Sequence, residues 1–492
     1  MGYIGRALQP SELPLFGSVI GQSKAGKVCC HNNPHVGFFA LDSLRQLAMR
    51  FLEKEELPHF KFQKDFLKPF EYTMVHNQNP EVRDMVCDYL FCLHPVLKLD
   101  DAGVTMPPAN DSGTSPKHEI WLADNVWRLL CCVEERITNS AFEIVTRLNK
   151  DHFPAIVRYG AFADMTVCIT EFCKVSKYQK ISLLAIAMLR GVIPVMLECP
   201  ECSFTPDGKP DPSADDPMIR FWFPVLFSFY DIIMNGEDLE VRRLALDSLF
   251  TTLKTYGSSY PVDFWDTVCQ ELLFPIFAVL KSSQDLSRFS TQEDMSVWLS
   301  TTMIQALRDL IDLYTYYFHV LERFLDGLLD LLCVCICQEN DTLARIGTSC
   351  LQRLLEGNIK KLSVVKWERI ITTFVKLFKT TTPHQLFDER LRVEIDEAGE
   401  EIPETAAEES KGAKPSAVDR RRIFRQIIVK CVLQLHLIET TNDLLRNDEV
   451  YQAIPPDQLL RLMGVLDQSY QFARMFNEDK ELRTGLWKVG KS

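Results

Sequence analysis

A twelve-residue phrase recurs along this chain and constrains its fold more than any other feature. Each copy opens with polar residues, carries an aliphatic residue at its fourth and twelfth places, and usually has a small or aliphatic residue at its eighth. Positions i, i+4 and i+8 lie on one stripe of an α-helix, so each copy predicts a helix with one buried face. The copies begin at residues 33, 79, 134, 178, 238 and 340.

The polar start of the phrase predicts how each helix begins. Asn33-Pro34 and Asn79-Pro80 place a capping side chain before a proline at the first helical position. The small residue at the eighth place would let a neighbouring helix approach closely. The phrase therefore describes helices that are both capped and closely packed.

The spacing of the copies predicts a repeat architecture. A HEAT-like pair of helices repeats about every 40 to 47 residues, and the shorter intervals here lie close to that period. Loops rich in Pro, Gly, Ser and Asp lengthen two units, and the last interval has room for a unit with a degenerate phrase near 294–307. We therefore predict an all-α fold, a HEAT-like α-solenoid of stacked helix pairs.

Composition shifts divide the chain. Residues 388–419 are rich in acids and poor in large hydrophobic residues, which predicts an acidic disordered linker. Helical periodicity returns after it, at 420–447 and 455–477. The predicted order is an N-terminal loop or short helix at 1–32, HEAT-like units at 33–97, a loop at 98–119, units at 120–197, a loop at 198–217, units at 218–387, the linker at 388–419, and C-terminal helices at 420–492.

Charge and hydropathy exclude several classes of protein. A formal net charge of −13 argues against nucleic acid as a partner. We expect no membrane span, because the closest apolar stretch, 324–337, carries Asp326 and Asp330. The first residues lack the apolar core of a signal peptide. These features predict a cytoplasmic chain.

The cysteines and histidines do not form a convincing metal site. Most of the 16 cysteines lie in apolar helical runs, where reduced cysteine is a small buried hydrophobe. Cys199 and Cys202 have ligand spacing but lack a second pair nearby. His31 and His35 flank two cysteines in an expected loop. We expect no metal and no cofactor.

Residues 21–28, "GQSKAGKV", come within one residue of the phosphate-binding loop pattern. Val28 stands where the pattern needs a Ser or Thr to hold Mg²⁺. The preceding residues also lack the buried strand from which such a loop emerges. We therefore expect a loop that connects helices and binds no phosphate.

Long segments of the chain resemble one family. Residues 38–86, 139–157, 222–260 and 343–362, followed by "LFKTTTPHQLF", resemble in order the region downstream of the catalytic domain in the large ARF guanine-nucleotide exchange factors of the Sec-seven/BIG group. The resemblance implies successive homology-downstream-of-Sec-seven domains, which are HEAT-like. Residues 87–130 do not match that family's pattern.

The family's catalytic segment, Phe-Arg-Leu-Pro-Gly-Glu-Ala-Gln, does not occur in this sequence, and Glu400 and Glu401 in the acidic linker are no substitute. The resemblance therefore implies a non-catalytic regulatory region. Its expected partners are ARF or Rab-type small GTPases and the Golgi and trans-Golgi membrane, to which it would bind peripherally, with a homodimer or a catalytic domain as further partners. The alternative is a general HEAT-repeat scaffold unrelated to ARF exchange.

Two basic clusters are candidate contacts for anionic lipid or an acidic GTPase surface. The simpler interpretation of the first is an ordinary solvated face, and the second can equally be a helix start that compensates the acidic linker. Phe62, Phe66 and Phe70 run beside the first cluster at i, i+4 and i+8 and are predicted to form its buried stripe. The candidate residues are Lys61, Lys64 and Lys68 in the first cluster, and Arg420, Arg421, Arg422 and Arg425 in the second.

Overall fold

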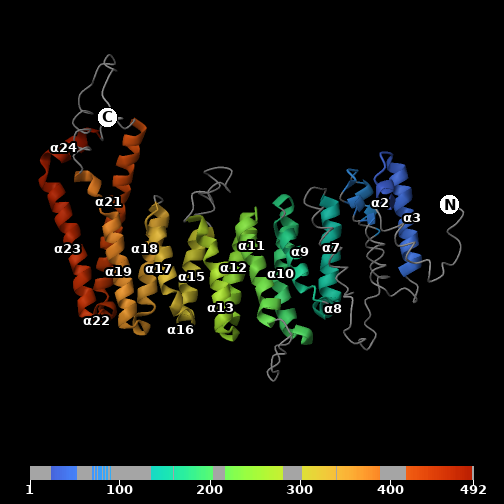
Figure 1. Ribbon diagram of the computed structural model, residues 1–492, viewed down its shortest axis with the longest axis horizontal. Coiled ribbons are helices and arrows are strands. Elements are labelled where there is room, and N and C mark those ends of the chain that lie inside the picture. Colours follow the sequence, from blue (N-terminus) through green and yellow to red (C-terminus); the bar gives the residue numbers. More distant parts are fainter. Residues whose placement is uncertain are drawn as a thin grey trace, which may run out of the picture. The chain divides into compact units, whose positions relative to one another are not determined.

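The computed structural model describes residues 24–52, parts of 69–89, and residues 135–202, 216–280, 302–338, 341–387 and 417–489, apart from 159 and 175. Every regular element within these ranges is helical (Figure 1). The chain divides into two compact units, Met1–Thr251 and Thr252–Ser492. Helices that follow one another in sequence pack together within each unit, so the predicted fold class, an all-α solenoid of stacked helices, is confirmed.

The first unit begins with a short helix packed on a long one, and its later helices pack chiefly on their neighbours. For example, α9 contacts both α10 and α11. The principal helices are α2 (Lys24–Cys29), α3 (Pro34–Leu52), α7 (Glu135–Asp151), α8 (Phe153–Arg158), α9 (Phe162–Lys174), α10 (Gln179–Glu198), α11 (Phe223–Asn235) and α12 (Leu239–Tyr256), whose last residues belong to the second unit.

The second unit continues the same architecture. Here α17 packs on α18, and α19 packs on both α21 and α23. Its principal helices are α13 (Val262–Val268), α15 (Ile304–Tyr316), α16 (Phe318–Leu321), α17 (Leu325–Ile336), α18 (Asp341–Glu356), α19 (Val364–Thr381), α21 (Ala417–Arg446), α22 (Asp448–Ala453), α23 (Pro456–Glu478) and α24 (Lys480–Val489), with the short 3-10 helix η12 (His384–Phe387) after α19.

The buried stripe predicted from the phrase is present in five copies. Residues at the predicted places are buried because they face the neighbouring helix. They are Val82 and Val86; Ala141 and Val145; Ile181, Ala185 and Leu189; Val241, Ala245 and Leu249; and Leu343, Gly347 and Leu351.

The first copy departs from the prediction. Val36 at its fourth place is 37% exposed, and Gly37 and Leu41 are buried in place of the fourth and eighth positions, whereas Leu44 at the twelfth place is buried as predicted. The reason is α2, which packs against α3 where a Cβ on Gly37 would lie 2.8 Å from the Cys29 carbonyl oxygen. The contact with α2 therefore shifts the start of the buried stripe by one residue.

The predicted caps are also present. The side-chain oxygen of Asn33 accepts a hydrogen bond from the His35 backbone N–H at 3.0 Å. Asn79 does the same for Glu81 at 2.9 Å. Each satisfies a donor that the first helical turn leaves unpaired.

The stretch predicted to be a connecting loop contains a helix. Lys24–Cys29 forms α2 because its inner residues find close partners. Gly26 lies against Tyr72, where a Cβ would be 2.7 Å from the ring. Cys29 is fully buried, and its carbonyl accepts a hydrogen bond from the Asn77 side chain at 2.9 Å.

The expectation that no stretch is apolar enough for a membrane span needs correction. Helix α10 is long and apolar enough by length and composition. In this structure 44% of its most apolar window is buried within the protein. Ile181, Ala185 and Leu189 lie on its buried side, which accounts for its high hydropathy as a core helix of the stack.

The helices predicted for the C-terminal part of the chain are present. The expected helices at 420–447 and 455–477 correspond to α21 and α23. Residues 417–419, expected to close the linker, already belong to α21. The remainder of the predicted linker lies outside the described residues, as do the loop at 98–119 and the unmatched segment 87–130 except for Tyr89.

Candidate interaction surfaces

The first predicted basic cluster cannot be placed. Lys61, Lys64 and Lys68 lie outside the described residues, together with Phe62 and Phe66. Phe70 is described and is fully buried, so the predicted apolar stripe is confirmed at that position.

The second predicted basic cluster lies on the first turns of α21. Arg420, Arg421 and Arg422 are within the helix, but their side chains are outside the described part of the structure. Arg425 is exposed, and Ile428 and Leu435, three and ten residues further on, are 62% and 65% exposed. These spacings put all three side chains on one side of the helix.

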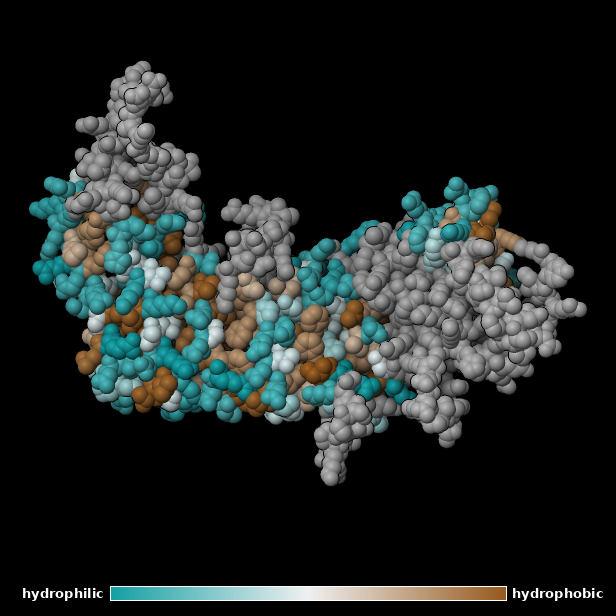
Figure 2. Space-filling model, in the orientation of Figure 1, coloured by the Kyte–Doolittle hydropathy of each residue, from teal (hydrophilic) through white to brown (hydrophobic). Residues whose placement is uncertain are grey.

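Exposed hydrophobic residues recur on the second unit. On the face visible in Figure 2, they form separate patches among hydrophilic residues. Helix α23 carries four of them, Leu460 at 70%, Met463 at 50%, Tyr470 at 63% and Met475 at 54% exposure. Scattered exposed apolar side chains are ordinary on protein surfaces, so these residues alone do not define a site.

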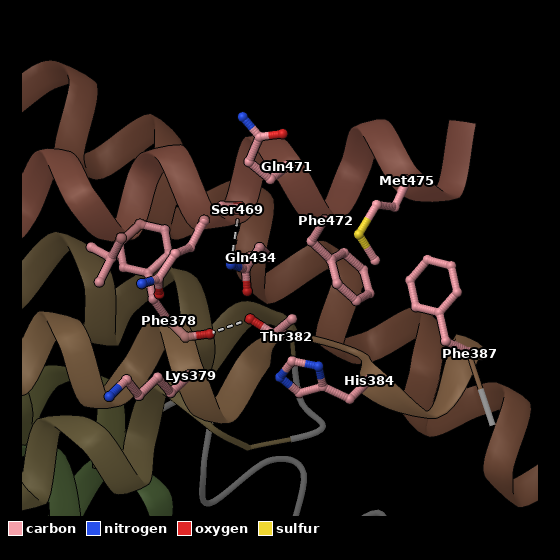
Figure 3. A pocket seen from close by; sticks show the side chains of 12 residues that line it. Phe378, Lys379, Thr382, His384, Phe387, Gln434, Ser469, Gln471, Phe472 and Met475 are labelled. Atoms are coloured by element: carbon pink, nitrogen blue, oxygen red, sulfur yellow. Dashed lines mark hydrogen bonds between the residues drawn. The ribbon is translucent and has the colours of Figure 1, made fainter. Parts of the chain in front are cut away.

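A cavity of about 500 Å³ lies between α19, η12, α21 and α23 (Figure 3). Phe378, Val465 and Phe472 supply much of its apolar wall, and Phe387 and Met475 close one end. The Phe472 and Phe387 rings meet edge to face, with centroids 5.2 Å apart. A concave, mainly apolar cavity of this size is typical of binding sites.

A polar network crosses the base of this cavity. Buried Thr381 donates a hydrogen bond to Gln434 Oε1 at 2.7 Å. Gln434 Nε2 in turn donates to Ser469 Oγ at 3.2 Å. The chain of bonds fixes the Gln434 amide, since its oxygen is held by α19 and its nitrogen by α23.

A small hydrophobic cluster lies beside the cavity and positions its walls. Leu386, Ile427 and Leu482 form the buried centre, and Phe387 and Phe472 pack against it. These residues come from η12, α21, α24 and α23. Packing of the C-terminal helices therefore holds two of the cavity's aromatic side chains in place.

A row of ion pairs joins α17 to α19. Asp326 accepts from Arg369 at 2.8 Å, and Asp330 lies 3.7 Å from Lys376. These side chains are between 51% and 67% exposed, so each pair contributes little to stability. These ion pairs line a second, more polar groove. The four charged side chains of the row are paired with one another, so they are not free to bind a charged ligand.

Three buried cysteines, Cys173, Cys333 and Cys350, are not suited to nucleophilic chemistry. Burial raises the pKa of Cys333 and Cys350 to about 11 each and raises the pKa of Cys173 further. A thiol with a raised pKa stays protonated near neutral pH, whereas the thiolate is the reactive form.

The candidate metal ligands have structural roles instead. Cys199 and Cys202 are 6% and 2% exposed and form a turn at the end of α10, in which the Cys202 N–H donates to the Cys199 carbonyl. His31 and His35 are exposed, and the His31 ring accepts from the Asn33 N–H. Among the described residues, no group of three or more His, Cys, Asp or Glu could hold a metal ion.

Sequence reasoning missed the cavity. Its walls come from segments nearly one hundred residues apart, from Phe378 to Met475. The short signal available was "LFKTTTPHQLF", which ends α19 and forms η12. Its sequence alone indicates only a family resemblance, because nothing local shows which helices pack against it.

Two family models match parts of the chain. The model described as "Mon2/Sec7/BIG1-like, HDS" matches residues 50–98, and the "BIG2 C-terminal domain" model matches residues 432–492. The expectation that 87–130 departs from the family's pattern is therefore wrong for residues 87–98. The second match includes the Gln434, Ser469 and Phe472 side chains of the cavity.

Curated relatives match nearly the whole chain. The ADP-ribosylation factor guanine nucleotide-exchange factor SEC7 of Saccharomyces cerevisiae is 35% identical over 96% of this chain and 27% of its own length. The exchange factor sec72 of Schizosaccharomyces pombe is 36% identical over 93% of this chain and 25% of its own. Brefeldin A-inhibited guanine nucleotide-exchange protein 1 of Homo sapiens is 29% identical over 94% of this chain and 28% of its own length.

A solved structure described as a circular tandem repeat protein covers 98% of this chain at 12% identity, with a TM-score of 0.26, which is too low to indicate a common fold. The stacked helices define an all-α repeat region, and the sequence matches relate that region to ARF guanine-nucleotide exchange factors. The chain represents a region of the ARF guanine-nucleotide exchange factor family, as its resemblance predicted. It spans about a quarter of the length of the curated relatives that it matches.

Proposed function

We propose that this chain is the non-catalytic regulatory and scaffolding C-terminal region of an ARF guanine-nucleotide exchange factor, acting in vesicle transport at the Golgi and trans-Golgi network. The observation that carries the proposal is the match of 93% or more of the chain to one part of several such factors. An all-helical stack offers extended surfaces for partners, which suits a regulatory region.

The proposed partners are ARF or Rab-type GTPases and the cytoplasmic face of Golgi membranes. The basic residues on the first turns of α21 and the lysines at 61, 64 and 68 are the proposed contacts for acidic surfaces. Binding to the catalytic domain of the same exchange factor, or to a second copy of the chain, would be a further means of regulation.

An exchange assay combined with a binding assay tests the proposal. We expect the purified chain not to accelerate GDP release from an ARF GTPase, because its sequence contains no match to the family's glutamate-bearing catalytic segment. We expect the same preparation to bind a GTP-loaded ARF or Rab GTPase more tightly than the GDP-loaded form.

Two outcomes would contradict it. A large, dose-dependent increase in GDP release would show that the chain is catalytic. Failure to bind any ARF or Rab GTPase in either nucleotide state, and failure to alter exchange by a separately supplied catalytic domain, would favour the alternative of a general HEAT-repeat scaffold.

A further inference from the structure

The polar side chains that line the cavity between α19, η12, α21 and α23 are one lysine, one histidine, one threonine, one serine and three glutamines. None of the lining residues is acidic, whereas Lys379 and His384 lie along one side (Figure 3). Lys379 is exposed and forms no ion pair within the described part of the chain. The cavity therefore favours a ligand that carries negative charge.

Two further hydrogen-bond donors, at the base of the cavity, also favour a negatively charged ligand or a carbonyl group. The Ser469 hydroxyl accepts a hydrogen bond from Gln434 Nε2, which leaves its own proton available. Gln434 has a second Nε2–H that no described acceptor uses. Both side chains are at most 9% exposed, so a carboxylate or carbonyl oxygen reaching them would be bound in a largely dry environment.

The walls suit an apolar group next to that charge. Phe378 and Val465 are 2% and 5% exposed, and Phe472 is half-buried between His384 and Phe387. Met475, which closes one end of the cavity together with Phe387, is 54% exposed and unbranched, so it can adapt to the shape of an incoming side chain. An aromatic or long aliphatic side chain would therefore find both a floor and a movable wall.

Two glutamines suit a polypeptide ligand in particular. Gln468 and Gln471 lie one turn apart on α23, are exposed, and form no side-chain hydrogen bond with described residues. A side-chain amide can donate to a peptide carbonyl and accept from a peptide N–H at once. A lipid tail would gain nothing from these groups.

We propose that this cavity is a docking site for a short acidic peptide segment of a partner protein, which inserts an aromatic or long aliphatic side chain between Phe378 and Phe472. The acidic residues of the peptide lie beside Lys379 and His384. This interaction does not depend on which GTPase the chain binds, or on whether it binds one.

A random peptide library provides a probe without assuming the partner's identity. Twelve-residue peptides displayed on phage are selected against the intact chain, and the winners are made as fluorescent peptides for anisotropy titrations. We expect selection of sequences that combine Asp or Glu with Phe, Trp, Leu or Met. Their affinity should fall at least fivefold in Lys379→Glu and in Met475→Ala.

Arg446→Glu is the matched control, because it makes the same charge reversal at an exposed residue of α21 that does not line the cavity. It should leave peptide affinity within twofold of the parent. Thermal unfolding of all three variants verifies that each is folded.

Three results would overturn the proposal: no enrichment from the library, winners without acidic residues, or winners that bind the Lys379→Glu variant as tightly as the parent. Displacement of an environment-sensitive probe by decanoate, with no peptide selected, would assign the cavity to small anionic amphiphiles instead. Because none of these readouts involves a GTPase, they fail or succeed separately from the proposed exchange-factor role.

Discussion

Gly347 of α18 faces Ile336 of α17 so closely that a Cβ atom on the glycine would lie 2.8 Å from Ile336 Cγ1 and 3.2 Å from its backbone nitrogen. Ile336 is fully buried, so it has little room to move. We expect Gly347→Ala to lower the free energy of unfolding by about 1 to 2 kcal/mol, because overpacking exceeds the gain in helix propensity. Chemical denaturation measures the difference.

Gly464 of α23 is the matched control for that substitution. It also lies inside a helix, but no atom lies within 4 Å of the position that its Cβ would occupy. We expect Gly464→Ala to stabilise the chain by about 0.5 to 1 kcal/mol through helix propensity alone. Equal effects at the two glycines would disprove the close contact between α17 and α18.

Local sequence patterns predicted one part of this fold and could not predict another. Periodicity and capping depend on residues a few positions apart, so the phrase predicted the buried stripe of α18 and the caps at Asn33 and Asn79. The shifted stripe at Gly37 depends on which element packs against α3, and no local pattern contains that information.

The cavity was beyond prediction for a related reason. Thr381, Gln434 and Ser469 are separated by the linker and by most of two helices, yet they form one hydrogen-bonded row. The sequence around each residue indicates only an ordinary polar position on a helix. Only the packing of α19 on α21 and α23 brings them together.

A half-buried ion pair joins α9 to α11 in the first unit. Lys174 Nζ lies 2.6 Å from Asp231 and 2.5 Å from Glu171, and all three side chains are about one fifth exposed. We expect Lys174→Met to cost about 2 to 4 kcal/mol, because two carboxylates lose their common partner. Urea denaturation at pH 7 measures the cost, and Arg243→Met, which breaks an exposed pair with Glu240, should produce no measurable change.

The pH dependence of that pair provides a second test of it. Burial of the ammonium lowers the Lys174 pKa, but hydrogen bonds to Asp231 and Glu171 outweigh burial and leave the pKa above its ordinary value. A raised folded-state pKa means that the stabilisation is complete below about pH 10.4, the unfolded value, and disappears as the pH rises through the folded value. The stability difference between the parent and Lys174→Met should therefore be constant from pH 7 to 9 and shrink above pH 10.5 or so. A difference that already falls between pH 7 and 9 would contradict this assignment.

The Cys199-Pro-Glu-Cys202 turn is expected to bind no zinc. Its two cysteines end α10 as buried side chains, and a structural zinc ion needs four ligands. Metal analysis of the purified chain should give far less than one zinc per chain. A stoichiometric signal that disappears when Cys199 and Cys202 are both changed to Ser would disprove this prediction.

The last prediction concerns the lysines at 61, 64 and 68. In the helix that the sequence predicts here, their i, i+3 and i+7 spacing would put them on one side, as a positive stripe on a chain whose net charge of −13 otherwise repels anionic membranes. Such attraction is additive, about 1 kcal/mol per lysine near an anionic surface, and is screened within about 8 to 10 Å at physiological salt. Replacing all three with Glu should reduce sedimentation with liposomes that contain phosphatidylserine or a phosphoinositide.

The control for the lysine variant is the same triple change at Lys150, Lys180 and Lys480, which are exposed and lie on three different helices. Both variants alter net charge equally, so only a localised stripe can make the first bind less than the second. Exposed charges contribute little to stability, and both should melt close to the parent. If the 61, 64 and 68 variant sediments as well as the control at 50 mM salt, roughly where screening is weak, the lysines are an ordinary solvated face, and membrane attachment would depend on protein partners or on the arginines of α21.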